Sequence, residues 1–154
     1  MNPDALTAIG LLSDFKPDDL DALAECATVI HYRKGDDVIT EGQPNGALFV
    51  VQSGLLHVRR KVQASHTLLG RLEPGSFFGE ISVFHPGPTT ATIHAMTDGV
   101  VLRMEAQNLR AFIDRRPAAG ASLLRRILEE MAARLRAADE RMTEAIVWGG
   151  LLRA

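Results

Sequence analysis

Cysteine is nearly absent from this chain. Cys26 is the one cysteine among 154 residues. No disulfide can form within the chain, and no Cys-x-x-Cys pair is present to bind a metal or carry out redox chemistry. We therefore expect a protein of a reducing compartment, the cytoplasm.

Long apolar runs and a strong net charge are also lacking. No apolar run approaches the ~20 residues of a membrane-spanning helix, and no charged leader precedes a long apolar segment at the N-terminus. We expect a soluble protein that is not secreted and does not contact a membrane. The formal net charge of −2 excludes a strongly basic field that gathers nucleic acid, although it permits a local basic patch.

Patterns typical of catalysis or metal binding are missing as well. The sequence has no nucleophile elbow, no Walker loop and no paired catalytic carboxylates. The histidines show no i, i+4 pairing and have no cysteine nearby, which gives a metal site little support; they are His31, His57, His66, His85 and His94. We expect no enzyme activity, no metal and no cofactor.

What the chain does contain is enough apolar sequence for one core. With 46% hydrophobic residues, 154 residues suit a single domain. The residue patterns divide the sequence into a helical segment at 1–28, a strand-rich part at 29–104 and a helical part at 105–154. Residues 3–12 and 17–26 each begin with proline and acidic residues before spaced apolar positions, which predicts two short N-terminal helices.

Short β-rich runs punctuated by glycine fill the middle part. They lie at 27–32, 36–40, 47–52, 55–62, 66–72, 90–96 and 100–104. This spacing predicts an antiparallel sandwich or barrel. Asn45-Gly46 and Asp98-Gly99 favour tight hairpins, so each is expected to join two neighbouring strands.

The C-terminal part predicts a helix at 105–116 and, after Pro117, a long uninterrupted helix. This long helix carries a heptad seam of Leu124, Leu128, Met131, Leu135, Ala138, Met142 and Ala145. We expect its first two turns to pack on the barrel and its later turns to form a parallel homodimer; the alternative is complete packing on the chain's own barrel. Arginines beside the seam alternate with acidic residues, which indicates a solvated, ion-paired face and not a nucleic-acid patch.

The segment "GSFFGEIS" has the chemistry of a phosphate cradle. Gly79 and Glu80 open a short predicted helix whose free N–H groups can face an anion, and "PTTATIHA" follows after a loop. A glycine-rich turn is by itself a weak signal, because most such turns bind nothing.

The order of these features resembles the cyclic-nucleotide-binding domain family, which includes catabolite-activator regulators and kinase regulatory subunits. The resemblance covers nearly the whole chain and includes "YRKGDDVITEGQPNGALFVVQSGLLHV" and "FFGEISVF". It implies an α+β fold: an antiparallel jelly-roll β-barrel with short N-terminal helices and a long C-terminal helix. In that family, a backbone N–H and the carboxylate of the glycine-glutamate pair bind the ribose, which here implies Gly79 and Glu80.

The phosphate-binding arginine of the family is not matched. The family reads Pro-Arg-Ala-Ala-Thr where this chain reads Pro88-Thr89-Thr90-Ala91-Thr92. The arginine guanidinium is charged and can donate two hydrogen bonds to phosphate, whereas threonine offers one neutral hydroxyl. The replacement is expected to reduce the binding free energy by about 2–4 kcal/mol, or the affinity by roughly 30- to 1,000-fold. The threonines either hold phosphate weakly or only satisfy nearby backbone groups.

The base-binding end departs from the family too. A Thr-Ser pair follows a Met-Ala-x-Arg-Leu run in regulators that contact adenine through the long helix, but Ala138 and Asp139 stand there in this chain. Asp139 either accepts from an exocyclic amino group, within one chain or across a dimer, or simply faces water. The expected ligand-binding residues are Phe78, Gly79, Glu80, Ile81, Ser82, Thr89, Thr90, Ala91 and Asp139.

Two functions fit the sequence. The first is a stand-alone sensor of cyclic AMP, cyclic GMP or another cyclic nucleotide or dinucleotide, with weak or altered cyclic AMP affinity. The second is a dimeric protein-interaction module that kept the fold and lost the ligand. Family regulators that bind DNA carry a helix-turn-helix after the long helix; none is found here, so we expect no direct DNA binding and an output through a downstream protein that the sequence does not identify.

Overall fold

Eight strands and five helical segments form in residues 10–12 and 14–151, which are the residues described by the computed structural model. The helical segments are η1 (Gly10–Leu12), α2 (Pro17–Glu25), α3 (Glu80–Phe84), α4 (Ala106–Arg115) and α5 (Pro117–Leu151). The strands are β1 (Ala27–Tyr32), β2 (Asp37–Ile39), β3 (Ala47–Ser53), β4 (Leu56–Val62), β5 (Ser65–Leu72), β6 (Phe77–Phe78), β7 (Thr92–Ala95) and β8 (Gly99–Glu105).

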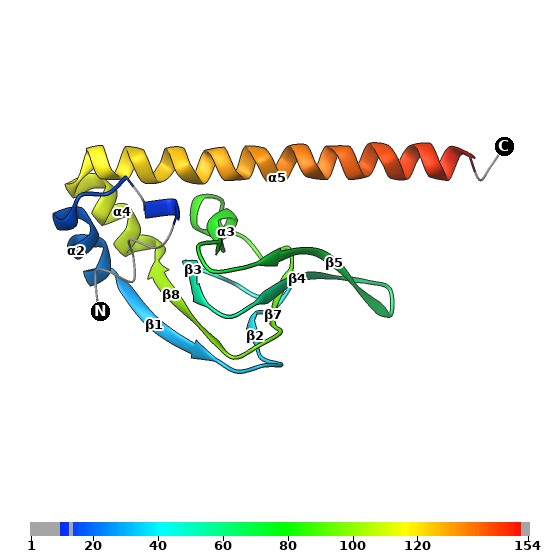
Figure 1. Cartoon of the computed structure of the whole chain (residues 1–154), viewed down its shortest axis with the longest axis horizontal. Coiled ribbons are helices and arrows are strands. Elements are labelled where there is room, and N and C mark those ends of the chain that lie inside the picture. The colour runs from blue at the N-terminus through cyan, green and yellow to red at the C-terminus, as the bar shows by residue number, and fades with distance from the viewer. Residues whose placement is uncertain (1–9, 13, 152–154) are drawn as a thin grey trace.

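The strands form two antiparallel four-stranded sheets that face each other. One sheet has the order β1-β8-β3-β6 and the other has the order β2-β7-β4-β5. Each sheet mixes strands from distant parts of the chain, as in a jelly roll. The α+β jelly-roll prediction, including the long C-terminal helix, is therefore confirmed (Figure 1).

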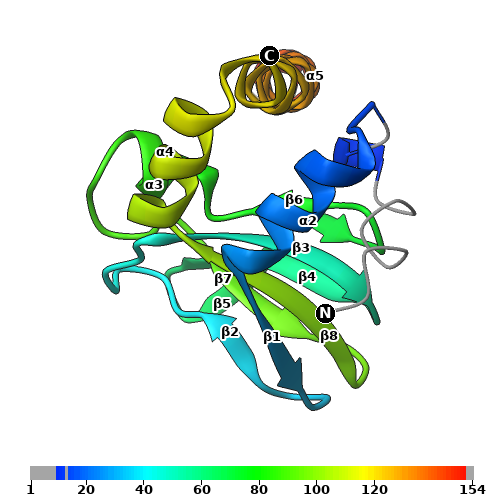
Figure 2. The same ribbon diagram turned by 90° about the vertical axis from the view of Figure 1, so that its left-hand side faces the viewer.

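Strand β3 shows how the layers are held together, because it is buried on both faces. Alternate side chains of a strand point to opposite faces. Ala47, Phe49 and Val51 pack between the two sheets, whereas Leu48 and Val50 join a second cluster with the helices. Figure 2 shows α2, α4 and α5 on the same side of the β1-β8-β3 sheet.

The prediction that two dipeptides form tight hairpins between neighbouring strands is wrong. Asn45-Gly46 connects β2 to β3, and Asp98-Gly99 connects β7 to β8, but each pair of strands belongs to different sheets. The Asn45 side chain instead bonds both backbone groups of Ala47, and the Asp98 carboxylate accepts from the Lys34 N–H. These dipeptides therefore support crossings between sheets, which need no tight two-residue turn.

The helices agree with the sequence in most places. The prediction of a helix at 17–26 is confirmed by α2, and those after Glu105 and Pro117 are confirmed by α4 and α5. The other N-terminal helix, predicted at 3–12, falls mainly outside the described residues; within them it is the short η1. None of the helices in the described ranges is long and apolar enough to cross a membrane.

The packing of α5 differs from the prediction. Ala119, Leu123 and Ile127 in its first turns are buried, whereas Leu124 and Leu128 of the predicted seam are 36% and 67% exposed. Gly120 allows the close approach that sets this rotation, because a Cβ there would lie 2.9 Å from the Ile113 Cα atom of α4. The first turns of the helix therefore pack on the core as expected, and Met131 of the seam is partly buried there, but Leu124 and Leu128 of the seam are not.

Candidate functional site

The cavity that contains the predicted site is built around a constrained turn at Gly79. This residue links β6 to α3 with a φ of +84°, and a Cβ here would lie 2.5 Å from the Ala47 backbone oxygen. The left-handed conformation favours glycine, and the close backbone contact excludes a larger residue. The turn places Glu80 at the start of α3, beneath α5 (Figure 1).

Glu80 is a buried carboxylate, with only 6% of the residue exposed. Burial raises its pKa, while its own backbone N–H and the charge of Arg134 oppose the rise. The Oε1 atom of Glu80 lies 3.5 Å from the Nη1 atom of Arg134 on α5. The ion pair therefore joins the predicted ribose-binding carboxylate to the long helix.

Arg134 is held by several further contacts. Its Nη2 donates to the Phe77 backbone oxygen at 2.9 Å, and its Nε donates to Glu130 at 3.1 Å. Its guanidinium also lies over the Phe77 ring, 4.8 Å from the centroid. With its donors and charge engaged in this way, Arg134 fixes α5 above the β6–α3 turn.

The Thr89 side of the cavity is neutral. The Thr89 hydroxyl donates to the Thr40 backbone oxygen at 2.6 Å, and the backbone of the same residue bonds Gln43 and Gly42. The hydroxyl proton is thus already used to hold the loop against the segment between β2 and β3. The N–H groups of Thr90 and Ala91 have no acceptor among the described turn and loop hydrogen bonds.

The two sides enclose a cavity of about 440 Å³, within the range of small-molecule sites. Eight of the nine predicted residues line it, namely Phe78, Gly79, Glu80, Ile81, Ser82, Thr89, Thr90 and Ala91. Asp139 is exposed and is not among the lining residues. A contact from Asp139 to a ligand in this cavity stays a prediction that would need a second chain.

Sequence reasoning missed the contribution of α5 to the cavity. Glu130, Arg134, Ala137 and Arg141 all line it. As one of the arginines beside the seam, Arg134 is predicted from the sequence to lie on a solvated, ion-paired face, and it does pair with Glu130. Its position in the Met-Ala-x-Arg-Leu run, four residues before Ala138, was the available signal.

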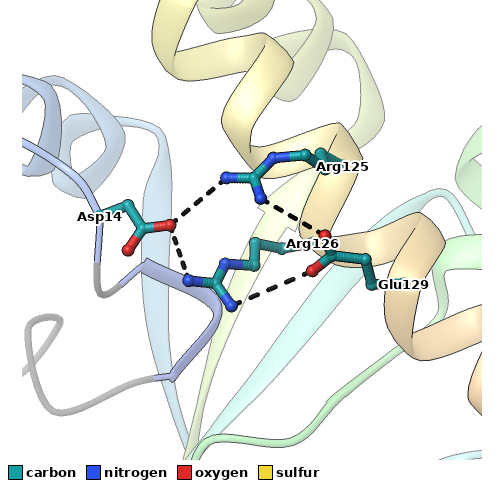
Figure 3. A network of polar contacts seen from close by, with 4 residues as sticks. All are labelled: Asp14, Arg125, Arg126 and Glu129. Carbon is teal, nitrogen blue, oxygen red and sulfur yellow. Dashed lines mark hydrogen bonds and ion pairs between the residues drawn. The ribbon is translucent and has the colours of Figure 1, made fainter.

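A second ionic network fixes the start of α5 near the N-terminal segment. The Asp14 carboxylate lies 2.6 Å from Arg126 and 3.4 Å from Arg125, and both arginines pair with Glu129 (Figure 3). The network lies on the same helix as Arg134, two turns closer to the N-terminus. The first half of α5 is therefore held by the core, by this network and by Glu80.

The chain was compared with known proteins. Residues 29–116, more than half of the chain, match the cyclic nucleotide-binding domain family. The CRP-like cAMP-activated global transcriptional regulator of Mycobacterium tuberculosis is 30% identical over 142 residues, which cover 92% of this chain and 62% of the regulator. A cGMP-dependent protein kinase of Caenorhabditis elegans is 33% identical over 95 residues, covering 62% of this chain and 12% of the kinase.

A solved structure is similar over most of the chain. The N-terminal domain of a transcriptional regulator from Streptomyces coelicolor A3(2) superposes with a TM-score of 0.71 at 28% identity, covering 90% of this chain and 95% of that domain. The chain spans less than two thirds of the length of the curated relatives named above. The similarity therefore concerns one domain of these larger proteins.

Proposed function

The chain belongs to the cyclic nucleotide-binding domain family, and from this we propose that it is a non-enzymatic regulatory domain that senses a cyclic nucleotide. The observation that carries the proposal is the convergence of Gly79, Glu80 and Thr89 on one cavity. Glu80 is buried there with one arginine contact, so its carboxylate can accept from a ribose hydroxyl. We also place the protein in the cytoplasm, in keeping with the free Cys26.

We propose that cyclic AMP binds weakly compared with family members that have the phosphate arginine. Thr89 offers no charge, and its hydroxyl proton is donated to Thr40. The backbone N–H groups of Thr90 and Ala91 remain to meet the phosphate. Neutral donors of this kind form weaker hydrogen bonds to phosphate than a charged bidentate fork does.

The output of the sensor would pass through α5. A ribose hydroxyl on Glu80 shares the carboxylate with Arg134, so occupancy would change the contact that joins α3 to α5. Such coupling requires that the ligand bind the two arrangements with different affinities. We propose that the change is read by another protein or by a second copy of this chain.

The second copy is suggested by the exposed seam of α5. Leu128, Leu135 and Met142 are 67%, 64% and 61% exposed, and α5 extends beyond the β4–β5 hairpin (Figure 1). We expect a parallel homodimer, with twice the 16.8 kDa mass of the chain in light scattering at micromolar concentration. Replacing both leucines by glutamate should give monomers, because like charges would face each other across the seam; Arg136→Glu is the control on the same helix.

A ligand-independent interaction module is the second candidate. It is favoured by Thr89, whose hydroxyl donates to the Thr40 backbone oxygen, and by Ala138 and Asp139, which depart from the family's base-contacting pair. In this case α5 and its seam would form the functional surface, and the cavity would be a remnant of the fold.

Calorimetry with cyclic AMP, cyclic GMP and cyclic di-GMP separates the two candidates. A sensor should bind at least one of them, and Glu80→Gln should weaken that binding by about 1–3 kcal/mol, the range for a hydrogen bond to a charged group. Glu140→Gln, an exposed change on α5, should leave the affinity unchanged. Absence of binding to all three nucleotides by folded wild-type protein would favour the interaction module.

A further inference from the structure

The α5 wall of the cavity carries a second arginine. Glu130, Arg134, Ala137 and Arg141 line the cavity and follow one another at spacings of four, three and four residues, which places them along one face of the helix. Arg141 comes seven residues after Arg134, so it lies about two turns, or roughly 10 Å, further along the axis. It is therefore well removed from the carboxylate of Glu80.

Arg141 differs from Arg134 in having no partner. None of the described residues forms a hydrogen bond or ion pair with its guanidinium. Its neighbours three and four residues away on the helix are Ala137, Ala138, Glu144 and Ala145, of which only Ala137 lines the cavity. A cavity-lining arginine without a carboxylate can direct all of its donors to a ligand.

Arg71 also lines the cavity, but its side chain lies elsewhere. It stands opposite His57 in the β4–β5 ladder. Leu56 and Val58, which flank His57, belong to the inter-sheet core, so His57 and Arg71 face the outside of the sheet. Among the described residues, Arg141 is thus the one cavity-lining arginine that is neither paired nor on the outer face of the β4–β5 hairpin, and it is exposed to solvent.

The position of Arg141 relative to Glu80 indicates what it meets. With the ribose at Glu80, a base directed along α5 extends toward Arg141. Guanine presents two acceptors, O6 and N7, on one edge, whereas adenine pairs the N7 acceptor with an N6 amino donor that opposes the arginine N–H groups. A cavity of about 440 Å³ suits one nucleotide better than a dinucleotide.

We propose that Arg141 reads the O6 and N7 edge of a guanine base and makes the site select cyclic GMP over cyclic AMP. This inference rests on the proposed function and deepens it by naming the base. A bidentate arginine–guanine pair discriminates against the wrong base by about 5- to 150-fold. We expect a preference of that size.

Cyclic IMP makes the test specific, because its base keeps O6 and N7 and lacks the guanine 2-amino group. Calorimetry on this 154-residue chain measures the affinities for cyclic GMP, cyclic IMP and cyclic AMP, for the wild type and for Arg141→Ala, Arg141→Lys and Arg136→Ala. Wild-type protein should bind the first two ligands with similar affinity and cyclic AMP at least about fivefold more weakly. Arg136 is exposed on the same helix and outside the cavity, so its variant is the matched control.

The variants should distinguish a specific contact of Arg141 with the base from a nonspecific attraction of its charge to any nucleotide. Arg141→Ala should weaken cyclic GMP and cyclic IMP by at least about fivefold and leave cyclic AMP within about twofold; Arg141→Lys should also reduce the preference, because it lacks the planar fork. Three results would overturn the inference and leave the proposed sensor standing. They are an equal loss of affinity for all three ligands in Arg141→Ala, equal affinities of the wild type for all three, and binding of cyclic GMP without binding of cyclic IMP. Tighter, Arg141-dependent binding of cyclic di-GMP would assign Arg141 to a second phosphate instead. If folded protein binds no cyclic nucleotide, the proposed function fails and this inference fails with it.

Discussion

The two sides of the cavity differ in how they are held. On one side, the Gly79 turn is fixed by a close backbone contact, and Glu80 is buried and paired with Arg134. On the other side, Thr89 is held by neutral hydrogen bonds to Thr40, Gln43 and Gly42. The first side keeps charged groups in the cavity and the second does not. The cavity therefore suits a sugar hydroxyl better than it suits a phosphate.

The largest expected effect comes from the fixed side. Gly79→Ala forces an L residue into a left-handed conformation and places a Cβ against the Ala47 oxygen. We expect the free energy of unfolding to fall by about 2–4 kcal/mol, from the backbone penalty and the overpacking together. Urea denaturation measures this loss.

Gly87→Ala is the matched control for that substitution. It lies in the loop between α3 and β7, where a Cβ would meet nothing within 4 Å. A change within about 0.5 kcal/mol is expected, as for most surface substitutions. Equal losses for both glycines would show that the turn at Gly79 is no more constrained than an ordinary loop.

An intermediate effect is expected on the neutral side. Thr89→Arg adds a charged guanidinium at the position where the resemblance predicts the phosphate-binding arginine, and it should tighten binding of cyclic AMP at least tenfold, about 1.4 kcal/mol. The variant loses the hydrogen bond to Thr40, so stability should drop by roughly 1 kcal/mol. Calorimetry measures the first quantity and urea denaturation the second.

Thr90→Arg tests whether position matters. It puts the same charge one residue further along the cavity rim, where Thr90 is exposed. We expect a smaller gain, because a fork at that position is not aligned with the family's phosphate site. A gain equal to that of Thr89→Arg would mean that any nearby positive charge is sufficient, and tight binding by the wild type would mean that the neutral donors already suffice.

The same contrast explains what the sequence could predict. The strand runs and the Gly79-Glu80 turn were visible because their signals are local. Strand β6 was missed because Phe77 and Phe78 are too few residues to show alternation. The two turn dipeptides were misinterpreted because a dipeptide does not specify which sheet each adjoining strand will join.

The contribution of α5 to the cavity could not be predicted from the sequence and became visible only in the fold. Arg134 is 54 residues from Glu80 in the sequence, and its nearer partner Glu130 gave it the pattern of a surface ion pair. The sequence did not show which face of α5 is buried, because Leu123 and Leu124 are equally apolar. In the fold Leu123 is buried, on a helix that approaches Ile113 of α4 closely at Gly120.

The smallest expected effect is a dependence of the free energy of unfolding on pH that comes from the titration of Glu80. Burial raises the pKa of Glu80 in the folded protein, against the opposing influence of its backbone N–H and Arg134. Between the ordinary pKa of glutamate and this raised value, the folded protein binds more protons than the unfolded chain. The free energy of unfolding must therefore decrease as pH rises through that window, and the loss is constant above it.

Glu80→Gln removes this titration, so the comparison of wild type and variant exposes it. As pH rises through the window, the wild type should lose stability relative to Glu80→Gln, by less than about 1.4 kcal/mol per pH unit because a single proton is involved. Urea midpoints measured at a series of pH values give the difference, and Glu140→Gln, on the exposed part of α5, should follow the wild type. A difference that instead grows in favour of the wild type with rising pH would mean that the Arg134 charge outweighs burial, and that the carboxylate side of the cavity is held mainly by its ion pair.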